Sequence, residues 1–434
     1  MSTNSRERWA THSGFIFASI GSAVGIGNIW RFPYLVGTNG GGAFLMSYVI
    51  VLIAFGLSFM MLEFAVGRYY QSSIIDCLAK IRKRFRWFGV FTVVITTLVT
   101  SYYVVILGWI LSFLVIISLF PQTTFEEFTN SMWPILAFFA IVAVNYLIIR
   151  RGIARGIERL NKIGVVVLVA LIIPLTVYGL LLPNSHKGVE YYLTPDFEIL
   201  GDAKIWSSAF GQIFFSLSIG FGSLVVYGSY LKKEHSLLKS SVAIIAADGL
   251  IAITAGFMIF SMLFSFGLNP EKGVPLVFHV MPLAFSEMDY GFLIGALFFS
   301  LLLVAGLTSS VGLFQVPVAA LEDTLKCTKK RSTLITCCVV AVVGMLPALS
   351  YSSFDLRFQE TKILDLMDEV FGTYGLSISA VLFSIAVLWF IDKKVLTEQF
   401  NIASTVKFPA WSIQVMKYVL PAIVLLTMIV HFGF

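Results

Sequence analysis

The sequence predicts an all-α integral membrane protein with eleven transmembrane helices. Of its 434 residues, 58% are apolar and only 12% are charged, whereas about 25% of the residues in globular domains are charged. The apolar residues gather into runs of about 20 or more, the length that a helix needs to cross a bilayer. Backbone polar groups must be paired inside hydrocarbon, and short segments of alternating polarity are absent, so helices are expected rather than a barrel. This composition excludes a soluble enzyme, a disordered scaffold and a secreted disulfide-bonded domain.

Eleven segments along the chain have the required length and apolarity. They are residues 12–36, 42–67, 87–120, 132–150, 163–182, 206–230, 238–268, 291–322, 332–350, 363–391 and 414–434. We expect a single membrane domain, 1–434, in which a first repeat (about 12–182) and a second (about 206–391) are followed by one extra helix (about 414–434). The polar stretch 269–290 contains three prolines between apolar residues, so we expect it to dip back as a short re-entrant or capping element.

Charged residues predict the orientation. Most of the 30 Lys and Arg residues fall in one set of loops and ends, and only Arg31, Lys187, Lys204, Lys272, Arg357 and Lys362 fall on the other side. The positive-inside rule then places the N-terminus in the cytoplasm, and eleven spans place Phe434 outside. The basic residues therefore indicate membrane topology in a plasma (inner) membrane, and no nucleic-acid partner is expected.

Two predicted spans are interrupted at mid-membrane. The first contains Gly21–Asn28 and the sixth contains Ser216–Gly222, and both stretches combine glycine with small polar residues. Close packing through small residues is one explanation. The alternative is a pair of broken helices, because spans one and six correspond if spans 1–5 and 6–10 are repeats of opposite topology. Such pairs point to a binding site at a repeat interface.

Carboxylates inside spans are costly and suggest function. Glu63 and Asp248 are the deepest, although Glu63 is close enough to a predicted membrane surface for simple solvation. The five His are scattered, the four Cys show no metal-site spacing, and no nucleophile–base pair is apparent, so no catalytic residues are expected.

At this point the residues resemble the neurotransmitter:sodium symporter family, in its prokaryotic eleven-span branch of bacterial leucine and amino-acid transporters. The similarity covers spans one to ten. The motifs that carry it are Arg8–Thr11, Gly21–Asn28, Trp30–Tyr34, Asn39–Phe44, Glu63–Arg68, Arg151–Glu158, Trp206 with Gly211–Phe215, and Ala305–Ser310.

The resemblance implies a 5+5 inverted-repeat core that couples sodium entry to uptake of a small amine-bearing solute. It implies two sodium sites. The first would use Ala23, Asn28, Ser216 and Asp248, completed by the substrate carboxylate; the second would use carbonyls of Gly21, Val24 and Ala305 with hydroxyls of Thr308 and Ser309. Oxygen ligands suit a hard cation such as sodium.

The resemblance also implies a substrate pocket and two gates. The pocket would consist of Ser22, Ala23, Ile26, Gly27, Val99, Tyr103, Phe215, Ser216, Ser218, Phe221, Ser309 and Leu313. The outer gate would pair Arg31 with Asp368, with Phe215 as a lid, and the inner gate would use Arg6, Trp9, Tyr230 and Asp323. Gly25 stands where monoamine carriers of the family have Asp, which favours an α-amino acid, and the pocket favours an apolar or aromatic side chain.

Three further expectations follow. Asp248 would supply the negative charge that chloride supplies in animal members, near Tyr48 and Gln212, so transport would be chloride-independent; a one-residue shift in span seven would instead place Ala247 there. Span five, with Gly164 and Pro174, is expected to unwind at its cytoplasmic end. A binding-only homologue, such as an amino-acid-sensing receptor, and a passive permease remain the alternatives to a transporter.

Overall fold

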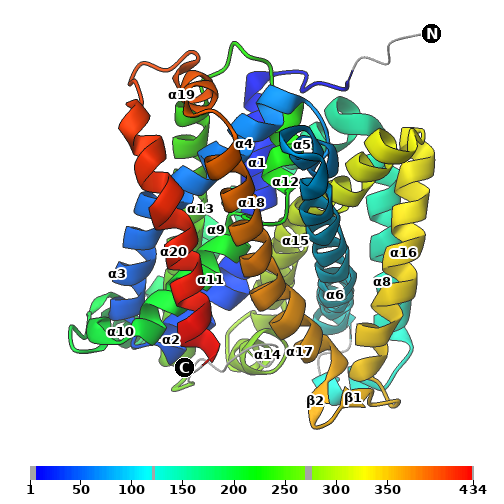
Figure 1. The fold of residues 1–434 in the computed structure, drawn as a ribbon. Coiled ribbons are helices and arrows are strands. Elements are labelled where there is room, and N and C mark those ends of the chain that lie inside the picture. The colour runs from blue at the N-terminus through cyan, green and yellow to red at the C-terminus, as the bar shows by residue number, and fades with distance from the viewer. Residues whose placement is uncertain (1–5, 120–122, 269–275, 433–434) are drawn as a thin grey trace.

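A computed structural model describes residues 6–119, 123–268 and 276–432, which form a bundle of helices (Figure 1). The described N-terminal segment and the described C-terminal end of the last helix lie at opposite ends of the bundle. We call these the N-terminal end and the C-terminal end. A chain that crosses the bundle an odd number of times starts and finishes at opposite ends, in agreement with the predicted eleven spans.

The long helices follow the predicted segments in order. Their bounds are α3 Gly42–Val51 with α4 Leu57–Tyr70, α6 Arg86–Leu119, α8 Trp133–Ile149, α9 Arg159–Leu181, α13 Leu237–Ser265, α15 Gly291–Leu325, α16 Lys329–Ser350, α17 Ile363–Met367 with α18 Leu376–Phe390, and α20 Ala410–Phe432. Wider π-helical turns at Leu52–Gly56, Ile153–Glu158 and Asp368–Gly375 join or extend several of them.

The two segments predicted to be interrupted are both interrupted. In the first, α1 (His12–Ala23) is followed by a π-helical turn, Gly27–Arg31, and α2 (Phe32–Thr38), with a bend of 48° at the break. In the second, α11 (Ala203–Ser216) and α12 (Ser223–Ser229) flank six non-helical residues. Broken helices in lipid require that other groups satisfy the freed backbone, which the site described below provides.

By length and composition, eight helices of the described chain can cross a membrane, or nine with the bent pair α1–α2. The remaining two predicted spans are α8, which has 17 residues, and the α11–α12 pair, whose pieces have 14 and 7 residues. The fifth span begins earlier than predicted, because the helical turn at Ile153 runs directly into α9.

Short elements close the two ends. Helices α5 (Ile74–Ile81) and α19 (Lys393–Asn401) lie toward the N-terminal end, and α10 (Ser185–Leu193), α14 (Met281–Ser286) and the hairpin of β1 (Arg357–Phe358) and β2 (Thr361–Lys362) lie toward the other (Figure 1). The short helix α7 spans Phe125–Thr129. Within the predicted capping element, Leu276–Ser286 is helical and Phe278 packs against Phe113 and Phe299 with ring centroids 5.1 and 6.2 Å away. Its first residues, 269–275, lie outside the described chain.

Small residues hold the broken helices at the centre of the bundle. Helix α12 packs on α4 where Gly67 meets the Val225 carbonyl and Gly228 meets the Phe64 carbonyl; an added Cβ would lie 2.0 and 2.7 Å from these oxygens. Such close approach is typical of helix packing in membranes. Helices α6 and α15 contact each other and, with α1, surround the space between the two breaks.

Candidate functional site

The first break exposes backbone groups beside two glycines. Helix α1 ends at Ala23, and Val24 has extended backbone angles (φ −74°, ψ 95°). A Cβ on Gly25 would lie 3.1 Å from both the Ser309 hydroxyl and the Tyr103 hydroxyl, and one on Gly27 would lie 2.8 Å from the Phe215 ring. The glycines therefore allow α6, α11 and α15 to approach the break closely.

The second break is held by side chains from other helices. Ser218, Gly220 and Gly222 have φ of +57°, +82° and +78°, which stops the helix. The Gly220 N–H donates to Glu63 Oε1 (2.9 Å), and the Ser379 hydroxyl donates to the Gly220 carbonyl (2.7 Å). The sequence marked Glu63 as a costly carboxylate without assigning it a role. In the structure, Glu63 satisfies a backbone N–H that the break leaves free.

A buried polar cluster joins the two breaks. Asn28 Nδ2 donates to Asp248 Oδ1 (2.8 Å) and to Ser216 Oγ (3.1 Å), and Ser216 Oγ lies 2.7 and 2.8 Å from the two Asp248 oxygens. The Tyr48 hydroxyl donates to Asp248 Oδ2 (3.3 Å). Asp248 is fully buried and Ala247 is half-buried, so the carboxylate of this turn is the one that faces the site.

Gln212 extends this cluster. Its Nε2 donates to the Gly27 carbonyl (3.2 Å), while its buried Oε1 has no hydrogen-bond partner within the described chain. The predicted ligands Asn28, Ser216 and Asp248 are thus in direct contact, and Ala23 lines the same cavity as Asn28 and Ser216. Buried oxygens with spare acceptor capacity are what a hard monovalent cation needs.

The second predicted sodium site lies between α1 and α15. The Thr308 hydroxyl donates to the Val304 and Ala305 carbonyls (3.0 and 2.9 Å), and the Ser309 hydroxyl donates to the Ser22 carbonyl (3.1 Å). Gly21 faces Thr308, because a Cβ on Gly21 would lie 3.1 Å from the Thr308 Cβ. Val24, another predicted ligand, is buried at the end of α1.

Asn161 adds an oxygen to this second location that sequence analysis missed. Its Nδ2 donates to the Ile157 carbonyl of its own helix (2.8 Å). Its Oδ1 is buried against Gly21 and has no hydrogen-bond partner among the residues described. An unsatisfied buried oxygen is costly, so this atom marks a place where a cation would be stabilised. Only its position in space, beside Gly21 and Thr308, distinguishes it from an ordinary polar residue of a membrane helix.

Between the breaks lies a small cavity. Its volume is about 10 Å³, roughly the room for one water molecule. All the predicted substrate residues except Ser22 and Ile26 line it, which leaves Ala23, Gly27, Val99, Tyr103, Phe215, Ser216, Ser218, Phe221, Ser309 and Leu313. The carbonyl of Ser22 instead receives hydrogen bonds from Ser218 and Ser309, and the Ile26 N–H donates to the Tyr103 hydroxyl (3.4 Å).

Between Phe215 and the C-terminal end, the bundle contains two further cavities. A cavity of about 90 Å³ lies between Phe215, Tyr103, Arg31 and Asp368, and a wider one of about 650 Å³ continues from Arg31 and Asp368 outward. The Arg31 guanidinium carbon lies 4.8 Å from the centre of the Phe215 ring, and the Tyr102 hydroxyl donates to Asp368 (2.8 Å). Arg31 and Asp368 form no ion pair with each other in the described structure.

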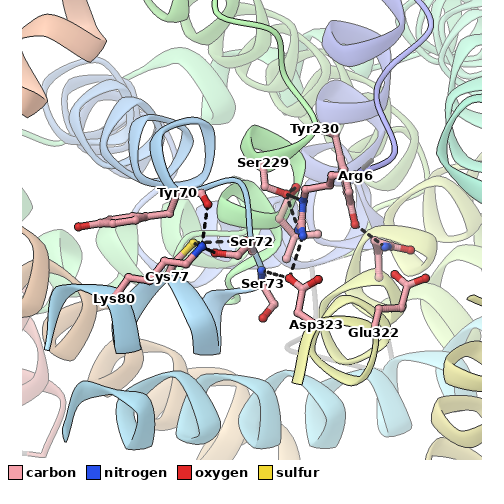
Figure 2. Close-up of polar contacts among 12 residues, drawn as sticks. Arg6, Tyr70, Ser72, Ser73, Cys77, Lys80, Ser229, Tyr230, Glu322 and Asp323 are labelled. Carbon is pink, nitrogen blue, oxygen red and sulfur yellow. Dashed lines mark hydrogen bonds and ion pairs between the residues drawn. The ribbon is translucent and has the colours of Figure 1, made fainter. Parts of the chain in front are cut away.

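On the other side of the cavity, the N-terminal end is closed. Arg6 NH1 lies 2.8 Å from Asp323 Oδ2, and the Arg6 side chain also donates to Ser229 Oγ at 2.8 and 3.0 Å (Figure 2). Asp323 receives a further hydrogen bond from the Ser73 N–H (2.5 Å), and the Arg6 guanidinium lies 4.9 Å from the Tyr230 ring centre. Burial lowers the pKa of Arg6, but Tyr230 and Asp323 more than offset this, so the pKa is raised overall.

Trp9 packs beside this ion pair, because Trp9 and Arg6 both contact the Tyr230 ring. It is buried, its indole N–H donates to the Tyr227 carbonyl (3.0 Å), and its ring meets Tyr227 and Tyr230 edge-on at 5.1 and 6.1 Å. All four predicted inner-gate residues therefore meet at one place. The predicted set missed Ser73, Ser229 and Tyr227, whose contributions depend on backbone groups or on small hydroxyls that carry no distinctive pattern.

Comparisons with known proteins identify what this arrangement is similar to. A family model described as the sodium:neurotransmitter symporter family matches residues 6–132 and 117–433. An uncharacterized sodium-dependent transporter of Methanocaldococcus jannaschii is 36% identical over 437 residues, which cover 95% of this chain and 87% of the relative. A protein of Haemophilus influenzae with the same description is 31% identical, with 99% of each chain covered.

A solved structure also matches over nearly the whole chain. The crystal structure of MhsT in complex with L-phenylalanine has a TM-score of 0.89 and 31% sequence identity, and the match covers 98% of this chain and 99% of MhsT. The fold predicted from the sequence is therefore confirmed as that of a known helical membrane protein.

Proposed function

Because this chain belongs to the sodium:neurotransmitter symporter family, we propose that it couples inward sodium movement to uptake of an apolar or aromatic α-amino acid by alternating access. The chain is a sodium-dependent transporter and not an enzyme. The observation that carries the proposal is the cavity between the two broken helices, which shares Asn28 and Ser216 with the Asp248 cluster.

In this proposal the substrate carboxylate and the first sodium bind together. Ala23, Asn28, Ser216 and Asp248 would hold the ion, and the Tyr103 hydroxyl would hold the carboxylate. The crowding at Gly25, where a Cβ would lie 3.1 Å from Tyr103 and Ser309, leaves no room for an acidic side chain that would pair with a bare amine. The phenylalanine in the MhsT complex supports an amino-acid substrate with an apolar side chain.

The second sodium would bind between α1 and α15. Carbonyls of Gly21, Val24 and Ala305 and hydroxyls of Thr308 and Ser309 would be its ligands, with Asn161 Oδ1 at its edge. The Thr308 and Ser309 hydroxyls now donate to carbonyls of α15 and α1, and a rotation of each about its χ1 bond would present the oxygen to an ion.

The two ends of the bundle would open in alternation. We propose that the N-terminal end faces the cytoplasm of a plasma membrane, as the Lys and Arg distribution predicts. The Arg6–Asp323 pair would then be the inner gate, and Arg31, Asp368 and Phe215 would form the outer gate. The closed N-terminal end and the hollow C-terminal end correspond to a carrier that is accessible from outside down to Phe215.

Uptake by the purified chain in proteoliposomes tests this function. Phenylalanine should accumulate under an inward sodium gradient, and potassium or a sodium ionophore should abolish accumulation. Phenethylamine, which differs only by the missing carboxylate, should not enter. Equal phenylalanine uptake in sodium and in potassium would indicate a passive permease, and sodium-dependent binding without accumulation would indicate a binding-only protein.

A further inference from the structure

Three arginines form a row at the N-terminal end of α9. Arg151, Arg155 and Arg159 are spaced four residues apart, and all three are exposed. Arg159 begins α9, Arg155 lies in the π-helical turn Ile153–Glu158 before it, and Arg151 precedes Gly152 (φ +85°). The fold places all three arginines at the wall of one cavity. The ion pairs given for the described chain include none of the three.

The neighbouring carboxylates are engaged elsewhere. Glu158 is buried on another face of the helix, where it accepts from the Ala10 N–H (2.8 Å) and from the Thr11 hydroxyl (2.9 Å) and pairs with Lys162 (2.7 Å). Glu7 accepts from the Ile153 N–H (3.1 Å). The positive charge of the arginine row is therefore left without compensation by these groups.

An apolar cavity of about 290 Å³ begins at this row. Arg151, Arg155 and Arg159 line it together with aliphatic side chains of α8, α9 and α15, namely Ile148, Leu160, Ile163, Val167, Val304 and Leu307. Ile163 is 57% exposed and Val167 is 37% exposed, so the cavity opens on the outer surface of the bundle. That surface belongs to a helix apolar enough to cross the membrane, and it therefore faces lipid.

The combination is amphipathic in the same sense as a phospholipid. A row of arginines at the end of a span lies at headgroup depth, and the aliphatic walls continue from it toward the hydrocarbon. Guanidinium groups bind phosphate oxygens in a bidentate manner. Basic pockets between transmembrane helices are a recurrent mode of binding anionic lipid headgroups.

We propose that this cavity is a binding site for one anionic phospholipid, with its phosphate on Arg151, Arg155 and Arg159 and an acyl chain between α8, α9 and α15. The inner wall of the cavity is formed by Gly164 and Thr308. A Cβ on Gly164 would lie 2.4 Å from the Thr308 Cγ2, so these residues are in contact. The lipid would cover the side of Thr308 that faces away from Gly21.

Native mass spectrometry of the full chain tests the lipid site directly. Delipidated protein is mixed with equal amounts of phosphatidylglycerol and phosphatidylcholine of the same acyl chains. One phosphatidylglycerol should be retained in preference to phosphatidylcholine. Each of Arg155→Gln and Arg159→Gln should reduce this preference about five-fold, as expected for one basic residue near an anionic surface.

Two controls separate a built site from general attraction. Arg82→Gln and Arg84→Gln remove exposed arginines that lie over the Phe390 and Phe85 rings, away from the cavity, and should leave the preference unchanged. Val167→Trp keeps every charge but fills the cavity, and should weaken retention of phosphatidylglycerol. Equal losses in all the arginine variants, or displacement of the lipid by inorganic phosphate, would overturn the proposal.

A second readout rests on the proposed sodium site. If the lipid seals the wall beside Thr308, the sodium concentration for half-maximal thermal stabilisation should be about three-fold lower in phosphatidylglycerol than in phosphatidylcholine. Arg155→Gln with Arg159→Gln should abolish that difference. A retained lipid with identical sodium dependence in both lipids would leave the binding site standing and overturn only its link to sodium. Equal retention of phosphatidylglycerol and phosphatidylcholine by the wild-type protein overturns the site even if transport is confirmed.

Discussion

The two ends of the bundle contain the two proposed gates, which have similar composition but different contacts. At the N-terminal end, Arg6 contacts Asp323 at 2.8 Å. At the C-terminal end, Arg31 lies over Phe215, Asp368 receives a hydrogen bond from Tyr102, and a cavity of about 650 Å³ continues outward. The difference shows that an arginine and an aspartate are not by themselves a closed gate.

The supporting contacts explain the difference. Asp323 has a second donor in the Ser73 N–H, Arg6 has the Ser229 hydroxyl, and Trp9 packs against two tyrosines above them. Charged hydrogen bonds of this kind contribute about 1.5–3 kcal/mol, whereas an isolated exposed pair contributes about 0–1 kcal/mol. The closed end is therefore held by a network of contacts, and in the proposed mechanism the open end would need only a small contribution to close around a substrate.

The largest effect is expected at the site between the two ends. Asp248→Asn keeps the shape but removes the negative charge of the cluster. The two proposed cations in this low-dielectric site would need that charge, because unbalanced charge there costs several kcal/mol. Uptake in gluconate should fall at least about 100-fold, which corresponds to about 2.7 kcal/mol or more. Chloride should restore part of the uptake of this variant, while wild-type uptake should be equal in both anions.

Tyr48→Phe is the matched control for this variant. It removes one hydrogen bond to Asp248 (3.3 Å) and leaves the charge in place, so it should change uptake only a few-fold. A wild-type protein that requires chloride would show that Asp248 is not the counter-charge.

Arg6→Ala should open the closed end. Loss of a charged hydrogen bond worth about 2 kcal/mol shifts the closed-to-open ratio about 30-fold. Cys77 reports this opening, since it is buried beside the gate and burial raises the pKa of its thiol to about 11 (Figure 2). Exposure would return that pKa toward its ordinary value and increase the reactive thiolate. Maleimide labelling of Cys77, followed by peptide mapping, should accelerate at least ten-fold.

Arg8→Ala is the control for charge at the same end, because Arg8 is exposed and belongs to no ion pair given for the described chain. Its labelling rate should match the wild type. Unchanged labelling in Arg6→Ala would mean that Trp9 packing alone keeps this end closed.

Thr308→Val tests the proposed second sodium site. Valine keeps the shape and removes one oxygen, so the sodium concentration for half-maximal uptake should rise about ten-fold, the equivalent of one hydrogen bond to a charged group. Ser310→Ala is the control, because that hydroxyl faces Asn145 of α8 (2.9 Å) instead. Identical sodium dependence in the Thr308 variant would show that this hydroxyl only forms hydrogen bonds within α15 and does not bind sodium.

Gly164→Ala tests whether α9 unwinds when sodium leaves toward the closed end. The added Cβ would lie 2.4 Å from the Thr308 Cγ2, and alanine stabilises a helix by about 1 kcal/mol relative to glycine. Hydrogen exchange of residues 160–170, which should be faster without sodium in the wild type, should become about five-fold less sensitive to sodium. Gly211→Ala, where a Cβ would meet nothing within 4 Å, should not change it.

The smallest effect is expected at the open end. Arg31→Gln removes a charge that forms no ion pair with any described residue. Cys77 labelling without substrate should therefore change less than about three-fold, within the range of an exposed pair. The effect of substrate on closure of the C-terminal end should be reduced by more than about three-fold in this variant. A large change in Cys77 labelling without substrate would show that the two gates are coupled before substrate binds.

Much of the fold follows from the sequence because the bilayer imposes simple requirements. Hydrocarbon demands long apolar helices, so the spans could be located from composition and length. Glycine and small polar residues at mid-membrane, at Gly21–Asn28 and Ser216–Gly222, indicated where helices stop, because the two segments occupy corresponding positions in the two predicted repeats. Asp248 stood out for the same reason, because a carboxylate in a span needs partners.

Only the tertiary structure decided how these parts meet. In the sequence, Asn161 is one polar residue near the start of a span. Its oxygen becomes a candidate cation ligand only because α9 packs on α1 beside Gly21. Glu63 reads as a costly carboxylate, and its hydrogen bond to the Gly220 N–H exists only because α4 and α12 lie side by side. The residues near Arg6 and Arg31 in the sequence likewise do not show which of the two arginines forms an ion pair. Residue type determines what a side chain can bind, but long-range packing determines which partner lies within reach.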